Sequence, residues 1–214
     1  MSRKLAASIF LSIIAICLVA GVYLYPFFPE RIASHWNSLG EVNGYMNRFM
    51  GVFLLPMIMF FIFVVYLVIP KIEPMKDNLK SFDSYYNSFW VTMALFLAYV
   101  YALTLYWNLG HVFNFSVAII PAFSVLWFMS GILLRHAKRN WFVGVRTPWT
   151  LYSDVVWDKT HKVSAKLFQG TAIITLLGIF FSHYAIWFVM IPLIASLIIS
   201  VGYSYFLYRK IQVQ

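Results

Sequence analysis

The residues best suited to chemistry in this 214-residue chain fall into two polar segments, 26–48 and 135–166. The first places His35, Trp36 and Asn37 next to one another, with Glu41 and Asn43 shortly after. An imidazole, an indole N–H, two amides and a carboxylate can donate and accept hydrogen bonds beside an aromatic ring. This combination suits ligand recognition, and we assign ligand sensing to these five residues.

A metal site is an alternative use of the first segment. His35 and Glu41 are six residues apart, which is not a standard helical pair. His111 and His183 occur in two other short loops, so three imidazoles could converge with Glu41 as a fourth ligand or as a base. A metal-assisted membrane enzyme at the outer surface is therefore one alternative function. The simpler interpretation is local hydrogen bonding of each histidine, with no cofactor.

The second segment predicts a surface that docks a partner. Thr147-Pro148 fits an N-cap followed by proline at the first helical position, and Ser153-Asp154 marks a second helix start. A helix from residue 153 would run directly into the next apolar run. The residues expected to be displayed for docking are Arg146, Thr147, Trp149, Asp154, Trp157 and His161. The alternative is a helix lying on the membrane by its Trp and Val side chains.

Common catalytic motifs are absent from both segments. The chain contains no CxxC, HExxH or GxSxG pattern, and its one cysteine is Cys17. Asp154 and His161 would lie two helical turns apart, too far for direct contact. The sequence therefore favours a protein that is not an enzyme.

The elements that must position these segments are membrane spans. Hydrophobic residues make up 62% of the chain and charged residues 11%, against roughly a quarter charged in soluble domains. The mean hydropathy is +0.79. A span needs about 20 apolar residues, and the sequence offers six runs, at 5–25, 49–69, 89–107, 115–134, 167–181 and, after a turn at Ser182-His183, on to 208. The prediction is an all-α integral membrane protein with six transmembrane helices.

The first run resembles a signal peptide only in part. Its apolar core is longer than usual and no A-x-A-like cleavage site follows, so we expect the run to be retained as a span. The organisation expected is 1–69 for the first two spans and their loop, 70–134 for spans three and four, and 135–214 for the second polar segment and the last two spans. These three parts would form one compact membrane domain.

Charge predicts the orientation. If both termini are cytoplasmic, fourteen of the sixteen Lys and Arg residues lie inside, and only Arg31 and Arg48 lie outside. The inside segments then carry the whole net charge of +9. The basic composition thus reflects topology and contact with the lipid bilayer, and no direct nucleic-acid binding is expected.

The spans themselves lack ionisable residues, since no Asp, Glu, Lys or Arg lies within the six runs. This argues against a proton-coupled transporter, although a small carrier or exporter of an apolar or peptide solute stays a further alternative. Ser196, Ser200 and Ser204 recur every four residues on one helix face. We expect them to pack against another helix of the same chain.

At the two polar segments the sequence resembles the SdpI family of bacterial membrane immunity and signal-transduction proteins. Residues 28–37, with Gly40-Glu41-Val42-Asn43-Gly44, are similar to the family's amino-terminal domain of unknown function. Residues 144–151, followed by Val156-Trp157 and Thr160-His161, are similar to its carboxy-terminal signature. The family more often has Ile where Val145 stands.

The resemblance implies a multi-pass protein of the bacterial cytoplasmic membrane with an immunity function. The family's namesake protects its producer from a secreted toxic peptide and holds a cytoplasmic repressor at the membrane once toxin is engaged. By this resemblance the first segment would meet a peptide toxin outside the cell, and the second would dock a repressor inside it.

Overall fold

The computed structural model describes residues 1–212 and is dominated by long helices. Six of them, with short helical extensions, are long and apolar enough to cross a membrane, which confirms the predicted fold class. The protein is accordingly a multi-pass protein of the cell membrane. The six helices are α1 (Arg3–Leu24), α2 (Arg48–Ile72), α4 (Asp83–Asn108), α6 (Ile120–His136), α8 (Asp154–Leu177) and α9 (Ala185–Gln212).

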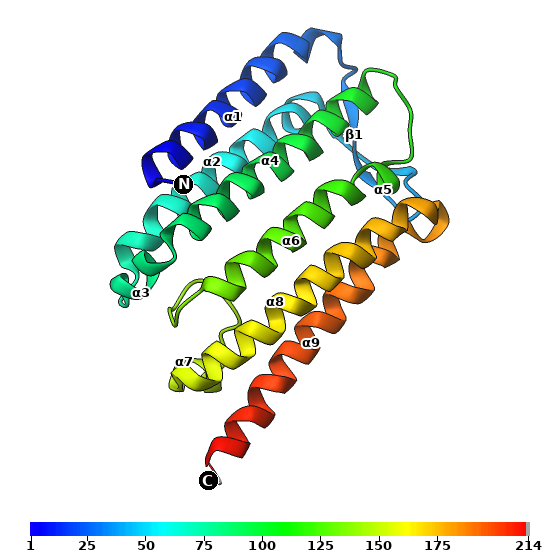
Figure 1. Cartoon of the computed structure of the whole chain (residues 1–214). Helices are drawn as coiled ribbons and strands as arrows, with labels where there is room; N and C mark the ends of the chain where they lie inside the picture. Colours follow the sequence, from blue (N-terminus) through cyan, green and yellow to red (C-terminus); the bar gives the residue numbers. More distant parts are fainter. Residues whose placement is uncertain (213–214) are drawn as a thin grey trace.

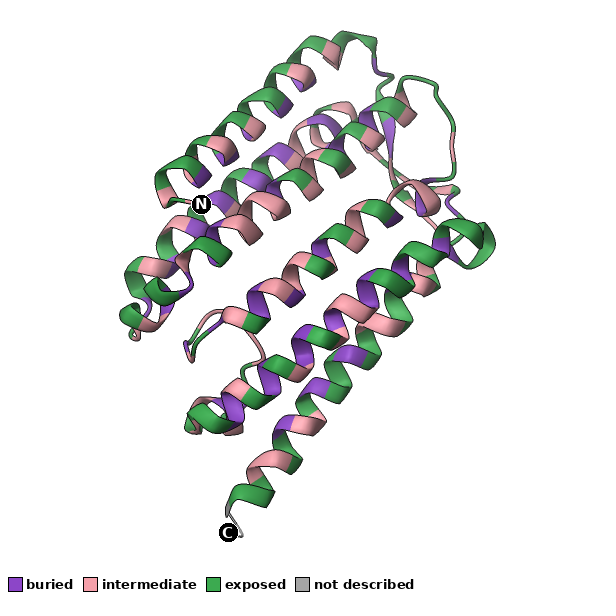
Figure 2. Cartoon of the chain, in the orientation of Figure 1, coloured by how far each residue is buried: buried purple, intermediate pink, exposed green. Residues whose placement is uncertain are grey.

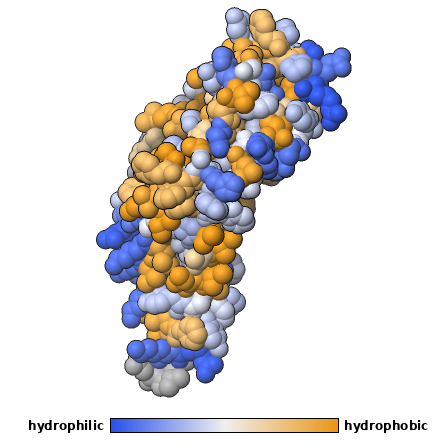
Figure 3. Space-filling view, turned by 90° about the vertical axis from the view of Figure 1, so that its right-hand side faces the viewer, coloured by the Kyte–Doolittle hydropathy of each residue, from blue (hydrophilic) through white to orange (hydrophobic). Residues whose placement is uncertain are grey.

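The long helices lie in two groups that meet where α4 packs against α6. Figure 1 shows α1, α2 and α4 side by side, with α6, α8 and α9 beside them. Buried residues lie on the faces turned toward neighbouring helices, and exposed ones face outward (Figure 2). The outward faces carry large apolar side chains such as Phe61 and Ile198, 68% and 66% exposed. Hydrophobic residues cover much of the face seen in Figure 3, with hydrophilic residues gathered in patches at the upper right, at the left and at the bottom. Such a surface suits a lipid environment.

The fifth span is part of a longer helix than its apolar run alone. The expectation that a helix from residue 153 continues into this span is confirmed, because α8 is unbroken from Asp154 to Leu177. Two 3-10 turns, Gly178–Phe180 and Ser182–Tyr184, then lead into α9, so the chain reverses where the sequence predicts.

The serine face of α9 packs within the chain, as expected. Ser164 donates to Ser200 at 2.8 Å, and Thr171 lies 2.8 Å from Ser196. Ser204 lies 3.2 Å from the hydroxyl of Thr147. These small hydroxyl side chains let α8, α9 and the segment before α7 (Pro148–Tyr152) approach closely.

A two-stranded antiparallel hairpin, not anticipated from the sequence, follows α1. It consists of β1 (Arg31–Trp36) and β2 (Val42–Asn47), with Ile32 opposite Met46 and Trp36 opposite Val42. The 3-10 turn Tyr25–Phe27 precedes it, and the short helix α5 (Phe115–Ala118) lies beside it. We call this end of the molecule the hairpin end. The opposite end, with both termini and the short helices α3 (Lys76–Ser81) and α7, is the termini end.

Candidate functional site

The hairpin turn is built by the side chain of Asn37. Its Oδ1 accepts hydrogen bonds from the backbone N–H groups of Leu39 and Glu41, at 2.9 and 3.0 Å. Its Nδ2 donates to the Glu41 carboxylate at 3.0 Å. Gly40 takes a φ of +81°, a conformation that favours glycine. Two of the expected sensing residues thus shape the turn.

The other sensing residues divide between the surface and a half-buried aromatic cluster. The Nδ1 of His35 lies 2.5 Å from the Oδ1 of Asn43, and both side chains are exposed. Trp36 stacks on Phe115 with centroids 3.9 Å apart and meets Trp107 edge-on. Among the described residues, no acceptor is placed for the buried Trp36 indole N–H. His35 and Asn43 are therefore the accessible pair, while Trp36 fixes the hairpin onto α5.

Polar residues that the sequence analysis missed hold the hairpin in place. Asn108, at the end of α4, pairs with the backbone of Ala33 in both directions: Oδ1 accepts from its N–H at 2.7 Å, and Nδ2 donates to its C=O at 3.0 Å. Asn114 donates to the carbonyl of Leu39, and Ser116 to that of Asn37. An amide at the very end of an apolar run is the one signal that could have pointed to Asn108.

Beneath the hairpin lies an apolar cavity of about 780 Å³, within the size range of small-ligand sites. Its walls come from the hairpin, α2, α4, the α5–α6 region and the first half of α9. Three methionines contribute, and methionine adapts its shape to different ligands. The lining includes His35, Trp36, Asn37, Met46, Met50, Leu54, Thr104, Ile119, Trp187, Met190 and Ile194.

The structure does not bring the metal candidates together. Within residues 1–212, no three His, Cys, Asp or Glu side chains are grouped so that they could hold an ion. His111 stacks on Tyr106, and His183 packs edge-on against Tyr184. His35 and Glu41 bond to their own hairpin neighbours. The described residues therefore do not show the convergence, since each of these side chains contacts neighbours of its own.

At the termini end, the segment between α6 and α7 is folded by buried polar groups. Asn140 is fully buried and accepts from the N–H groups of Phe142 and Val143 at 2.9 and 2.6 Å. Glu73, also fully buried, accepts from Trp141 N–H at 3.0 Å. Sequence reasoning missed both, although an acid directly after a span and before a proline is a visible signal for Glu73.

Trp157 and His161, expected to face a partner, are buried instead. Trp157 is 0% exposed and donates from Nε1 to the carbonyl of Ala137 at 2.8 Å. His161 is 2% exposed; its Nε2 accepts from the N–H of Val145 at 3.1 Å. Its Nδ1 lies 2.9 Å from the carbonyl of Trp157, which fits a neutral ring with the proton on Nδ1. The two residues share a helix face as predicted, but residues 137–147 cover that face.

The remaining docking candidates differ in exposure. Thr147 is buried and forms a capping box with Thr150 at the start of α7. Arg146 and Asp154 are exposed, and Asp154 pairs with Arg139 at 2.8 Å. Trp149 is half-buried against Tyr205 of α9. A docking surface would therefore use Arg146, Asp154 and the outer edge of Trp149, supported from below by Trp157 and His161.

Two family models match two different parts of the chain. A domain of unknown function (DUF1648) matches residues 12–60, which include the whole hairpin. The SdpI/YfhL protein family matches residues 136–204, which include the segment before α7, α8 and most of α9. No solved structure matches the chain.

The similarity to one curated protein extends over almost the whole chain. Immunity protein SdpI of Bacillus subtilis (strain 168) is 26% identical over 205 residues, covering 94% of this chain and 96% of the relative. The two matched regions include the hairpin and the loop folded over Trp157 and His161. The chain is therefore similar to the SdpI/YfhL protein family over residues 136–204 and to the DUF1648 domain over the region of its hairpin.

Proposed function

We propose that this protein is an SdpI-like membrane immunity protein that gives resistance to a toxic peptide and does not act as an enzyme. Similarity to an immunity protein over nearly the full length supports the general function. The observation that supports a toxin-binding site is the apolar cavity of about 780 Å³ beneath the hairpin. A peptide that attacks membranes presents apolar side chains, and this cavity offers them apolar walls with polar groups at its hairpin edge.

Three features of the cavity fit a peptide ligand. Met46, Met50 and Met190 can adapt to side chains of different shape. His35 and Asn43 are exposed at the hairpin, where they could bond a peptide backbone. The buried indole N–H of Trp36 has no acceptor within the described chain, and leaving such a donor unpaired costs about 1–3 kcal/mol. A carbonyl oxygen brought by the ligand would relieve that cost.

Orientation follows from the charge distribution. The termini end carries most of the Lys and Arg residues, so we place it in the cytoplasm and the hairpin outside. The toxin then meets the cavity from the outer side without crossing the membrane.

We further propose that the termini end docks a cytoplasmic repressor, which would couple immunity to signalling. The surface available is Arg146, Asp154 and Trp149, extended by the exposed side chains of Tyr152 and Val155. Because α9 lines the cavity with its first half and meets Trp149 through Tyr205 at the termini end, a shift of α9 at the cavity would also move this surface.

Survival of a toxin-sensitive bacterium tests the site. Cells would express wild type, Met190→Trp, His35→Ala or the matched control Ile191→Trp, and would be challenged with secreted peptide toxins. Met190 lines the cavity, whereas its neighbour Ile191 is 61% exposed and does not. We expect Met190→Trp to lose protection at equal membrane level and Ile191→Trp to keep it.

Two results would contradict the proposal. Equal protection by Met190→Trp and Ile191→Trp would remove the cavity as the toxin site while leaving the immunity function intact. No protection by wild type that is correctly inserted would refute the immunity function itself for the toxins tried.

A further inference from the structure

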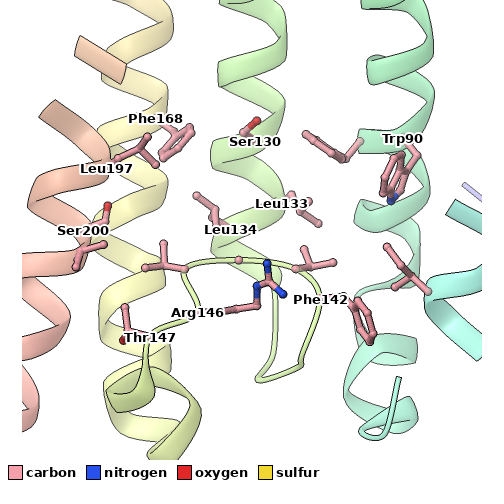
Figure 4. A pocket seen from close by; sticks show the side chains of 16 residues that line it. Trp90, Ser130, Leu133, Leu134, Phe142, Arg146, Thr147, Phe168, Leu197 and Ser200 are labelled. Atoms are coloured by element: carbon pink, nitrogen blue, oxygen red, sulfur yellow. The ribbon is translucent and has the colours of Figure 1, made fainter. Parts of the chain in front are cut away.

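A second cavity, of about 390 Å³, lies at the termini end between α4, α6, α9 and residues 142–147. Figure 4 shows its side chains converging from these separate elements. Its walls are mostly apolar, with Leu134 of α6, Phe168 of α8 and Leu197 of α9 on one side and Trp90 of α4 on the other. The cavity is separate from the one beneath the hairpin, and it shares only Arg146 with the docking surface proposed above.

Among the described residues that line this cavity, Arg146 alone carries a charge. In Figure 4 its guanidinium rises from the loop into the space between Leu134 and Phe142. One of its nitrogens, Nη1, donates to the carbonyl of Trp141 at 2.5 Å. A guanidinium has five N–H donors, so a single carbonyl leaves most of its hydrogen-bonding capacity unused.

No acidic residue in the described chain neutralises Arg146, because none lies within 4 Å of it. The carboxylates at this end have other partners. Glu73 accepts from the N–H groups of Met75 and Trp141. The others pair as Asp77 with Lys80, Asp83 with Arg3, Asp154 with Arg139, and Asp158 with Lys138. Arg146 is exposed and bonds only one carbonyl, so its charge is available to an anion that approaches the apolar walls. Such an anion must come from outside the chain.

The walls identify the kind of anion. A small soluble anion would satisfy Arg146 but leave the apolar surface around it unfilled. Leu197 and Val201, which line the cavity on α9, are 46% and 45% exposed, so the cavity opens sideways on the lipid-facing flank of that helix. A molecule with a phosphate next to an acyl chain matches both the charge and the walls.

We propose that this cavity binds one anionic phospholipid, with its phosphate on Arg146 and an acyl chain along Leu134, Phe168 and Leu197. The guanidinium donates to two phosphate oxygens, and the acyl chain enters between α6 and α9. Because residues 142–147 form both the wall of the cavity and the cover over His161, the lipid helps to hold that loop in place. The proposal does not depend on the identity of the toxin or on immunity.

Lipid titration of the purified protein in neutral detergent tests the proposal, with native mass spectrometry counting bound lipids. The probes are phosphatidylglycerol, phosphatidylcholine and the soluble headgroup glycerol phosphate. The variants are Arg146→Gln, Arg146→Lys, Leu197→Trp and the matched control Arg135→Gln. Arg135 is an exposed cation in the last turn of α6, also at the termini end, and it does not line this cavity. Gel filtration verifies that each variant is folded.

The expected result is one tightly held phosphatidylglycerol in wild type and in Arg135→Gln. Arg146→Gln should weaken it about fivefold, the effect of roughly one basic residue beside an anionic headgroup. Arg146→Lys should keep most of the binding, and Leu197→Trp should weaken both lipids by filling the acyl site. Equal phosphatidylglycerol affinity in Arg146→Gln and wild type would overturn the proposal and leave Arg146 to protein docking. Displacement by glycerol phosphate alone would also overturn it, since the occupant would then be a soluble anion.

Discussion

Replacing Gly144 by alanine should destabilise the protein by disrupting the loop that covers α8. Gly144 has a φ of +115°, and a Cβ built there would lie 2.3 Å from Nε2 of His161. The backbone conformation alone costs a non-glycine residue about 1–3 kcal/mol. The clash must also push the ring away from the N–H of Val145, and an unpaired buried N–H adds about 1–3 kcal/mol. We therefore expect a loss of about 3 kcal/mol.

Two other glycines separate these contributions. Gly110 has a φ of +97°, but a Cβ there meets no atom of the described chain within 4 Å. Gly110→Ala should therefore show the backbone strain without the clash, and lose only about 1–2 kcal/mol. Gly202 lies within α9, where a Cβ also meets nothing. Gly202→Ala should be neutral or gain up to about 1 kcal/mol from helix propensity.

Thermal loss of folded protein, followed by gel filtration in detergent, measures the differences. At about 2–4 °C per kcal/mol for a chain of this size, Gly144→Ala should melt about 6–12 °C below wild type. Combining it with His161→Ala should cost less than the sum of the two single changes, because the ring that clashes is gone. A Gly144→Ala variant as stable as Gly110→Ala, or strict additivity with His161→Ala, would refute the contact with the ring.

Three further predictions follow from other contacts. Asn108→Ala removes both hydrogen bonds to Ala33, so amide hydrogen exchange in β1 should speed up by a factor matching about 1–3 kcal/mol. The control Asn43→Ala, at the exposed edge of the hairpin, should leave the exchange rate unchanged. Equal exchange rates in the two variants would contradict the anchoring role of Asn108. Trp157→Phe loses the bond to Ala137 and should lower stability by about 1–3 kcal/mol in the same melting assay, and an unchanged melting temperature would count against it. On a Cys17→Ser background, a membrane-impermeant maleimide should label Ser38→Cys in intact cells and Ser81→Cys only after lysis, whereas the reverse pattern would invert the orientation.

The membrane spans could be predicted from the sequence because lipid imposes a simple requirement. In hydrocarbon every backbone polar group must be satisfied within the segment, so a run of about 20 apolar residues has to be a helix. The serine spacing on α9 was equally informative, since residues four apart share a helix face. The start of α8 was readable from Ser153-Asp154, because capping depends on local side chains.

The hairpin was not predictable because little of its stability is local. Its strands, RIASHW and VNGYMN, contain few β-branched residues, and burial alternates along β2 but not along β1. What holds them are amides about seventy-five residues away, such as Asn108 on Ala33 and Asn114 on Leu39. A hydrogen bond from a residue so distant in the chain leaves no recognisable pattern in the sequence of either strand.

The candidate sites show the same division. The residue types at 35–43 and 144–161 mark both polar segments as more than connectors, and helical spacing correctly puts Trp157 and His161 on one face. Which way that face points is set by residues 137–147, which fold over it through Asn140, Glu73 and Gly144. Spacing within one helix cannot reveal which other segment covers it.

The sequence by itself determined the spans, their caps and the location of the polar segments, because these depend on lipid and on neighbouring residues. Only the tertiary structure decided which polar side chains are buried as supports, which stay exposed, and where the cavities form, since these depend on segments distant in the chain that meet on folding.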